Sequence, residues 1–146
     1  MFTVRTQNQA GTYPDDPASV KSMMELLRLG LRSGAEVLDV EAAWGEGEWG
    51  GLVADARGER YGRGKTLLMG SHHVPHSVVS DEEARRWAAV CEMGGAADAV
   101  KLILSCDEEG GAGQALRCCE EEVRRRVREV GVARSGVWSN ESCLTR

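Results

Sequence analysis

The stretch TLLMGSHHVPHSVVSDEEARRWAAVCEMGGAADAVKLIL, residues 66–104, contains two apolar runs separated by a helical pattern. Thr66–Ser71 and Ala99–Leu104 have the length and composition of buried strands. Between them, Ser80 and Glu83 have the spacing of a capping box, which marks the start of a helix. A strand, a helix and a second strand in this order predict a parallel βαβ unit with a right-handed crossover.

The chain before this stretch repeats the same alternation. Phe2–Arg5 is extended in pattern, and Asp16 is a good N-cap for a helix that ends at Gly34. Val37–Glu41 follows as another short apolar run that stops on carboxylates. The sequence therefore predicts an α/β fold built from consecutive parallel βα units.

Two further segments are less regular. Residues 42–64 are rich in glycine and charge, and we expect a loop there with at most a weak helix. A last helix is expected over Gln114–Val130, and the tail Val132–Arg146 has no clear period.

The composition of the chain excludes several classes of protein. The chain has 146 residues and a formal net charge of −5, which gives no support for nucleic acid as a partner. It has no apolar run of the ~20 residues that a membrane span needs, and its N-terminus lacks a signal-peptide pattern. The five cysteines have no zinc-type spacing and read as reduced thiols. We predict a cytoplasmic protein with no membrane or nucleic-acid partner.

Ionisable residues recur where the expected strands end. Arg5, Asp39 with Glu41, His73 and Lys101 each lie at or near the carboxyl end of a different strand. The carboxyl ends of parallel strands meet at one edge of a sheet, where α/β proteins hold their active sites. The sequence predicts a catalytic site at this edge.

Lys101 is the first candidate for chemistry. Apolar residues flank it on both sides, so it lies within an otherwise buried strand. Burial destabilises an ammonium ion, and a free lysine amine can attack a ketone or aldehyde to form an imine. The alternatives are a lysine that reaches solvent at a strand end or one that pairs with a carboxylate.

The cluster of His72, His73 and His76 has three possible interpretations. One at a strand end can act as a general acid and base. They could instead bind a metal together with Asp39 or Glu41, but adjacent residues on a strand point to opposite faces, which disfavours a shared ion. A surface loop that happens to contain histidines is the third reading. We predict no metal.

The alternate spacing of Asp39 and Glu41 places both carboxylates on one face of their strand. A carboxylate there can orient a histidine or support its charged form. Salt bridges to Arg5 or Lys101 are the other reading, and both can hold together.

Four motifs carry a resemblance to a known family. They are FTVRTQ (Phe2–Gln7), GAEVLDVE (Gly34–Glu41), GSHH (Gly70–His73) and GAADAVKL (Gly95–Leu102). In order and spacing they resemble the type I 3-dehydroquinate dehydratases, in the form of the dehydroquinase domain of the fungal multifunctional AROM polypeptide.

The resemblance implies a (β/α)₈ TIM barrel, of which residues 1–107 would supply roughly strands three to six. Residues 108–131 would add a further helix of the same domain, and 132–146 form a divergent tail compatible with disorder. The family's two opening strands and its later substrate-carboxylate segments are not recognisable. We therefore expect this polypeptide alone to be weakly active or inactive.

The implied reaction is the dehydration of 3-dehydroquinate to 3-dehydroshikimate in the shikimate pathway of aromatic amino acid biosynthesis, without a cofactor. By resemblance, Lys101 forms the Schiff base and His73 is the acid–base residue. Asp39 and Glu41 match catalytic-site carboxylates.

The substrate contacts implied by the resemblance are Arg5 and Gln9. Gln9 stands where many members have a glutamate, and it retains the ability to bond a hydroxyl. Val74 stands where an aspartate or asparagine is common in the family, so an apolar side chain follows the histidine here.

Other functions remain open at this point. The chain could be another class I imine-forming enzyme, such as an aldolase, or an inactive barrel fragment that serves only as an interaction module. The resemblance is compatible with a homodimer or with a place in a multifunctional polypeptide.

Overall fold

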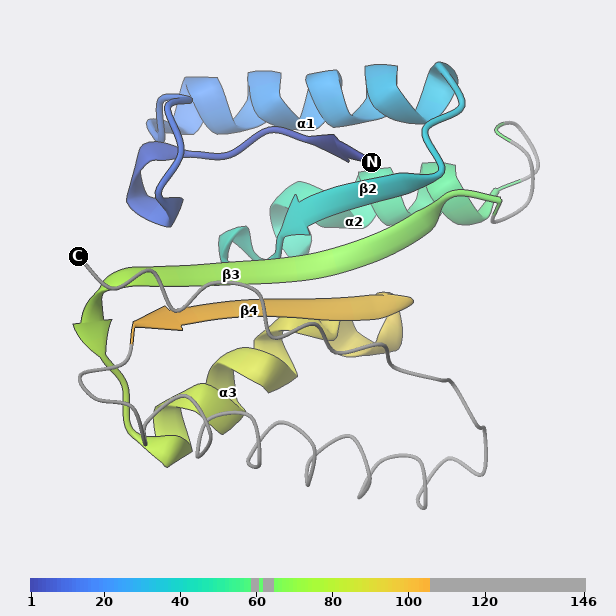
Figure 1. The fold of residues 1–146 in the computed structure, drawn as a ribbon. Coiled ribbons are helices and arrows are strands. Elements are labelled where there is room, and N and C mark those ends of the chain that lie inside the picture. Colours follow the sequence, from blue (N-terminus) through green and yellow to red (C-terminus); the bar gives the residue numbers. More distant parts are fainter. Residues whose placement is uncertain (59–60, 62–64, 106–146) are drawn as a thin grey trace, which may run out of the picture.

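The computed structural model describes residues 1–58, 61 and 65–105 (Figure 1). The helix expected over Gln114–Val130 and the tail over 132–146 lie outside the described residues. The regular elements, in chain order, are β1 Phe2–Thr3, α1 Pro17–Arg32, β2 Val37–Glu41, α2 Glu46–Arg57, β3 Leu67–Val78, α3 Asp81–Cys91 and β4 Ala99–Ser105. Short 3₁₀ turns η1 Gln7–Gln9, η2 Ala42–Trp44 and η4 Met93–Gly95 lie between them.

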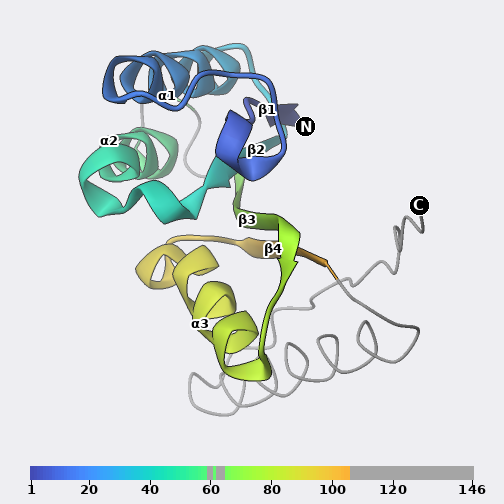
Figure 2. The same cartoon turned by 90° about the vertical axis from the view of Figure 1, so that its left-hand side faces the viewer.

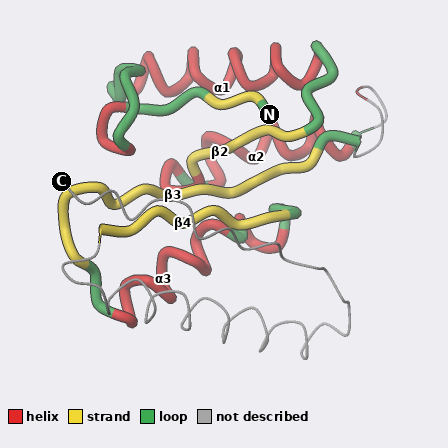
Figure 3. The backbone as a smooth tube through the Cα atoms, in the orientation of Figure 1, coloured by secondary structure: helices red, strands yellow, loops and turns green. Residues whose placement is uncertain are grey.

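The strands form one parallel four-stranded sheet in the order β1-β2-β3-β4, as the alternation predicts. Helices α1, α2 and α3 all lie on the same side of this sheet (Figure 2). Strand and helix alternate along the chain, and η1 lies at the end of the sheet where β2, β3 and β4 finish (Figure 3). A parallel sheet of consecutive βα units with its helices on one side is the arrangement expected for part of a TIM barrel.

The helix boundaries follow from their caps. The Asp16 carboxylate accepts hydrogen bonds from the main-chain N–H groups of Ala18 and Ser19 at the start of α1. Ser80 and Glu83 form the expected capping box at the start of α3. Helix α1 ends at Arg32, just before Gly34, whose φ of 78° suits glycine.

Helix α2 is the largest departure from the sequence expectation, because twelve residues there are helical rather than mainly loop. Its glycines weaken the helical signal. Trp49, Leu52 and Ala56 nevertheless face the core at helical spacing, and this tertiary burial outweighs the low propensity.

Two strands differ in length from expectation. β1 covers only Phe2–Thr3, because the chain turns away toward η1 after two paired residues. β3 runs to Val78, well past Ser71, because it continues to pair with β4 through an irregularity between Val74 and Val78.

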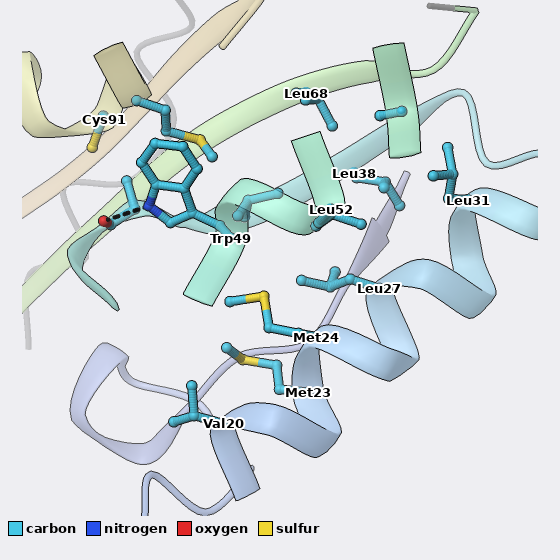
Figure 4. Close-up of a cluster of buried hydrophobic side chains, with 14 residues drawn as sticks. Val20, Met23, Met24, Leu27, Leu31, Leu38, Trp49, Leu52, Leu68 and Cys91 are labelled. Atoms are coloured by element: carbon cyan, nitrogen blue, oxygen red, sulfur yellow. Dashed lines mark hydrogen bonds between the residues drawn. The ribbon is translucent and has the colours of Figure 1, made fainter. Parts of the chain in front are cut away.

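The hydrophobic core lies between the helices and the outer face of the sheet (Figure 4). Leu38 and Val40 of β2 and Leu68 of β3 are fully buried in it. Their partners from α1 and α2 include Met23, Met24, Leu27, Leu31, Trp49 and Leu52.

Gly70 of β3 allows the C-terminal end of α3 to lie against the sheet. A Cβ atom at this position would lie 1.8 Å from the main-chain oxygen of Cys91. Only glycine fits, and the close contact sets how α3 lies along β3.

Candidate active site

Asp39 is the centre of a charged cluster on the inner face of the sheet, away from the helices. Its carboxylate is fully buried and lies 2.6 Å from Arg5 Nη2 and 3.1 Å from Lys101 Nζ. Ser71 Oγ donates a hydrogen bond of 2.5 Å to Asp39 Oδ1 and accepts one of 2.9 Å from Arg5 Nη1. A single buried carboxylate thus joins side chains from the β1 segment, β3 and β4.

Strand register explains this convergence. Along β2, Leu38 and Val40 face the helices, so Asp39 and Glu41 face inward. Ser71 of β3 is paired with Lys101 of β4, which puts both side chains at one level of the inner face.

Competing effects set the ionisation of Asp39. Burial raises its pKa, but the Ser71 hydrogen bond and the charges of Arg5 and Lys101 lower it by more. The net pKa lies below the usual 3.8, so Asp39 is ionised at neutral pH and balances the two cations.

Glu41 holds the segment that carries Arg5. Glu41 Oε1 lies 3.5 Å from Arg5 Nη1, so the two side chains form an ion pair. The Thr6 N–H donates to the same oxygen at 2.8 Å, and Oε2 lies 2.7 Å from both Thr6 Oγ1 and Trp44 Nε1. Its oxygens are occupied by protein groups, so Glu41 fixes the β1–η1 connection.

His73 presents an unpartnered ring nitrogen. Its main-chain N–H donates to Gln9 Oε1 at 2.8 Å, while the buried Nε2 has no hydrogen-bond partner within the described residues. Burial, followed by the charges of Arg5 and Lys101, lowers the pKa of His73 to about 4, against smaller opposing effects of Asp39 and the Gln9 main chain. His73 is therefore neutral at neutral pH and able to accept a proton.

His72 faces the other way, as expected for adjacent strand residues. Its ring stacks on Trp87 of α3 with 3.6 Å between ring centroids, and Nδ1 lies 2.9 Å from Gln9 Nε2. Across the described ranges, no three histidine, cysteine, aspartate or glutamate side chains are placed to hold a metal ion.

The structure brings the predicted residues together in two linked groups. Arg5, Asp39, Glu41 and Lys101 form the charged cluster, and both salt bridges anticipated for Asp39 are confirmed. Gln9, expected at the substrate hydroxyls, instead has its amide bonded to the two histidines.

Sequence reasoning missed the roles of Ser71, Thr6 and Trp44. Ser71 could have been found, because it precedes His73 by two residues and so shares its face of the strand. Thr6 and Trp44 reach Glu41 through turns whose geometry the sequence pattern did not predict.

Comparison with known proteins assigns the family. The profile of the family described as Type I 3-dehydroquinase matches residues 1–109. The chain belongs to the type I 3-dehydroquinase family. The resemblance in its motifs is thus confirmed, as is the prediction of a partial TIM barrel.

Individual relatives agree with this family assignment. The pentafunctional AROM polypeptides of Saccharomyces cerevisiae strains YJM789 and S288c are 35% identical over 85 residues, 58% of this chain and 5% of theirs. The 3-dehydroquinate dehydratase of Geobacillus kaustophilus superposes with a TM-score of 0.62 at 26% identity, covering 84% of this chain and 45% of that one. For dehydroquinate dehydratase and shikimate dehydrogenase of Schizosaccharomyces pombe AroM the values are 0.64 and 25%, with 93% and 23% covered.

The chain of this family member thus spans less than half the length of these solved structures. Among its described helices, none combines the length and the hydrophobicity that crossing a membrane requires.

Proposed function

We propose that this chain carries the Schiff-base and proton-transfer machinery of a 3-dehydroquinate dehydratase, which converts 3-dehydroquinate to 3-dehydroshikimate. The observation that supports it most directly is that Lys101 and a neutral His73 lie on the same face of the sheet, with no hydrogen-bond partner for His73 Nε2 among the described residues. Membership of the family agrees with this reaction, as does the activity for which the solved Geobacillus kaustophilus relative is named.

Lys101 is proposed as the nucleophile. As Lys101 Nζ bonds to the C3 ketone carbon, two of the three protons of its ammonium group pass to the ketone oxygen, which leaves as water, and an iminium ion joins the substrate to the lysine. The iminium keeps the positive charge that the ammonium had, so Asp39 serves as its counter-ion in both states. Because Asp39 is already ionised and held by Ser71 and Arg5, little reorganisation accompanies this step.

His73 is proposed as the acid–base residue. The iminium acidifies the C2 proton, and His73 accepts it through Nε2. The charge of Asp39 favours the imidazolium that results. His73 then returns the proton to the C1 hydroxyl, which departs as water. Hydrolysis of the iminium releases the product and restores the amine, so the net change is the loss of one water.

Arg5, Gln9 and Glu41 complete the proposed site. Arg5 bonds Ser71 and reaches the same layer as Lys101, where its guanidinium can bind a substrate hydroxyl. Glu41 and Gln9 are better supported as residues that fix this layer, since their polar atoms are taken by protein groups.

An ultraviolet assay for the conjugated product tests the function, with excess enzyme so that a single turnover is visible. We expect the His73→Asn variant to be slower than the wild type by about 10²–10⁴-fold, the usual contribution of a general acid–base residue. A wild-type chain without product formation, or an unimpaired variant, contradicts the proposal. Run at steady state, the same assay tests the expectation that this polypeptide alone is a weakly active or inactive catalyst, whereas the proposal requires only the single turnover.

We also propose that the protein acts in the cytoplasm, as a homodimer or within a multifunctional polypeptide. The AROM relatives, named as pentafunctional, support the second arrangement. Light scattering of the purified protein, together with the size of the native gene product on a denaturing gel, distinguishes the two.

A further inference from the structure

The side-chain amide of Gln9 lies between the two histidines of β3. Gln9 is almost completely buried at the end of η1, and both ends of its amide are used. Oε1 accepts a hydrogen bond of 2.8 Å from the His73 N–H, and Nε2 lies 2.9 Å from His72 Nδ1. One planar group therefore links the main chain of His73 to the ring of His72.

The ends of the strands explain why this link is needed. β2 finishes at Glu41, which pairs with Ser71, whereas β3 continues beyond it. The His73 N–H therefore lies past the last residue of β2, and Gln9 supplies the acceptor in place of a neighbouring strand. Because this N–H adjoins the His73 side chain, the Gln9 contact helps to set where the ring is held.

His72 in turn fixes Gln9. The His72 ring is held flat against Trp87, with 21° between the planes. With Oε1 facing the His73 N–H, the amide must present its NH₂ to His72, so Nδ1 has to be an unprotonated acceptor. A turned amide would place NH₂ against the His73 N–H, two donors together, which is unfavourable.

We propose that His72 is a positioning residue, which acts through Gln9 to hold His73 in the geometry for proton transfer. His72 does not touch the reacting atoms, because its ring packs on α3 while Lys101 and Asp39 lie on the opposite face. The proposal rests on the proposed function only in taking His73 as the proton-transfer group.

The groups around His72 keep this link intact at neutral pH. Trp87 from α3 and Gln9 from η1 contact the ring, Leu102 of β4 lies beside it in register, and the charge of Arg5 acts on it. Burial, and then Arg5, lower the pKa of His72, so its ring is neutral and Nδ1 is free to accept. Protonation of Nδ1 would put a donor against the amide and release Gln9.

Two substitutions separate this role from simple packing. His72→Phe keeps an aromatic ring for the stack on Trp87 but removes the acceptor. His72→Asn places an amide oxygen near the position of Nδ1, where it can accept from Gln9 but cannot titrate. We expect His72→Phe to lower kcat by about 10–10²-fold with little change in KM, the scale of a small misplacement of a catalytic group.

His72→Asn is expected to recover kcat to within about threefold of the wild type, since the hydrogen bond to Gln9 is restored. When kcat is measured against pH, the fall toward acid pH that protonation of His72 causes in the wild type should also be missing in His72→Asn. A His72→Phe variant with wild-type kcat, or a His72→Asn variant as impaired as His72→Phe, would overturn the proposal.

Nuclear magnetic resonance gives a readout that needs no turnover. We expect the His72 nitrogen shifts to show Nδ1 unprotonated and Nε2 protonated. The His73 amide should exchange with solvent faster in His72→Phe than in the wild type or His72→Asn. Equal exchange in all three overturns the positioning role. If the wild type does not dehydrate 3-dehydroquinate, the proposed function fails. The exchange rate of the His73 amide still tests whether His72 helps to position His73.

Discussion

The two faces of one sheet have opposite chemistry, although their residues alternate along the same strands. On the outer face, Leu38 and Leu68 are buried among the side chains of α1 and α2. On the inner face, Asp39 directly follows Leu38, and Ser71 lies three residues after Leu68. Asp39, which accepts a hydrogen bond from Ser71, pairs with the cations of Arg5 and Lys101. A strand period of two therefore separates the residues that stabilise the fold from those that carry out the chemistry.

The energetics of the two faces differ as well. Apolar burial on the outer face is favourable wherever shapes match, so that face tolerates exchange among similar hydrophobic residues. Buried charges on the inner face are costly to desolvate and are offset only by well-placed partners. Stability should thus depend on charge at the inner face and on side-chain volume at the outer face.

The largest expected effect is on turnover, from Lys101→Arg on the inner face. Arginine keeps the positive charge next to Asp39 but cannot form the imine. Dehydration should fall by at least about 10⁴-fold, while the free energy of unfolding changes by less than about 1 kcal/mol. Stopped-flow ultraviolet measurements and urea titration report the two quantities.

Lys65→Arg is the matched control, since Lys65 is exposed ahead of β3. Comparable loss of turnover in both arginine variants would contradict a specific role for Lys101.

Next comes the outer face, where Leu38→Ala should lower the free energy of unfolding by about 3 kcal/mol. The estimate follows from removing a fully buried leucine and leaving a cavity. Leu67→Ala is the control, because Leu67 is 49% exposed and its loss should cost less than about 1 kcal/mol. Similar midpoints in urea for both variants would contradict the division of the faces.

Asp39→Asn should have a smaller effect on stability, about 2 kcal/mol, because Arg5 and Lys101 lose their shared counter-ion but partly reach solvent. Thermal unfolding at low salt measures it. Asp55, whose side chain is 41% exposed and pairs with Arg28, provides the control: Asp55→Asn should cost less than about 0.5 kcal/mol. A stabilised Asp39→Asn protein would show that the cluster is not balanced as described.

The smallest effect at neutral pH is expected from the ionisation of His73, which alters stability only as the pH falls. The pKa of His73 is lowered to about 4 in the folded protein, whereas an unfolded histidine titrates near 6.5. Between these values the unfolded chain binds more protons, so this contribution to stability is lost as the pH falls from about 6.5 to 4.

Urea titrations across that range should show a shallower decline for His73→Asn than for the wild type. A steeper decline in the variant would mean that His73 is stabilised in its charged form, the opposite of the burial argument.

The contrast between the faces also explains what the sequence could and could not predict. The strands β2 and β4 and the caps of α1 and α3 were predictable because periodicity and capping are local. The meeting of Asp39 and Lys101 was predicted from strand ends, but Lys101 is the third of seven residues in β4, and its register with Ser71 is what brings it to Asp39. The helical content of α2 was underestimated because this helix is stabilised by the packing of Trp49 and Leu52, which cannot be predicted from a glycine-rich segment.

Contacts that depend on turn geometry were beyond sequence reasoning. The path of η1 places Gln9 beside β3, where its side-chain amide contacts His72 and His73. The twelve-residue length of β3 likewise depends on β4 continuing alongside it.

Borohydride trapping with 3-dehydroquinate, followed by peptide mass spectrometry, tests most directly whether the inner face forms an imine. We expect a reduced adduct on Lys101 in the wild type and in His73→Asn, because the imine precedes proton transfer, and none in Lys101→Arg. An adduct on another lysine, an adduct formed only with other carbonyl compounds, or no adduct in the wild type would contradict the role assigned to Lys101.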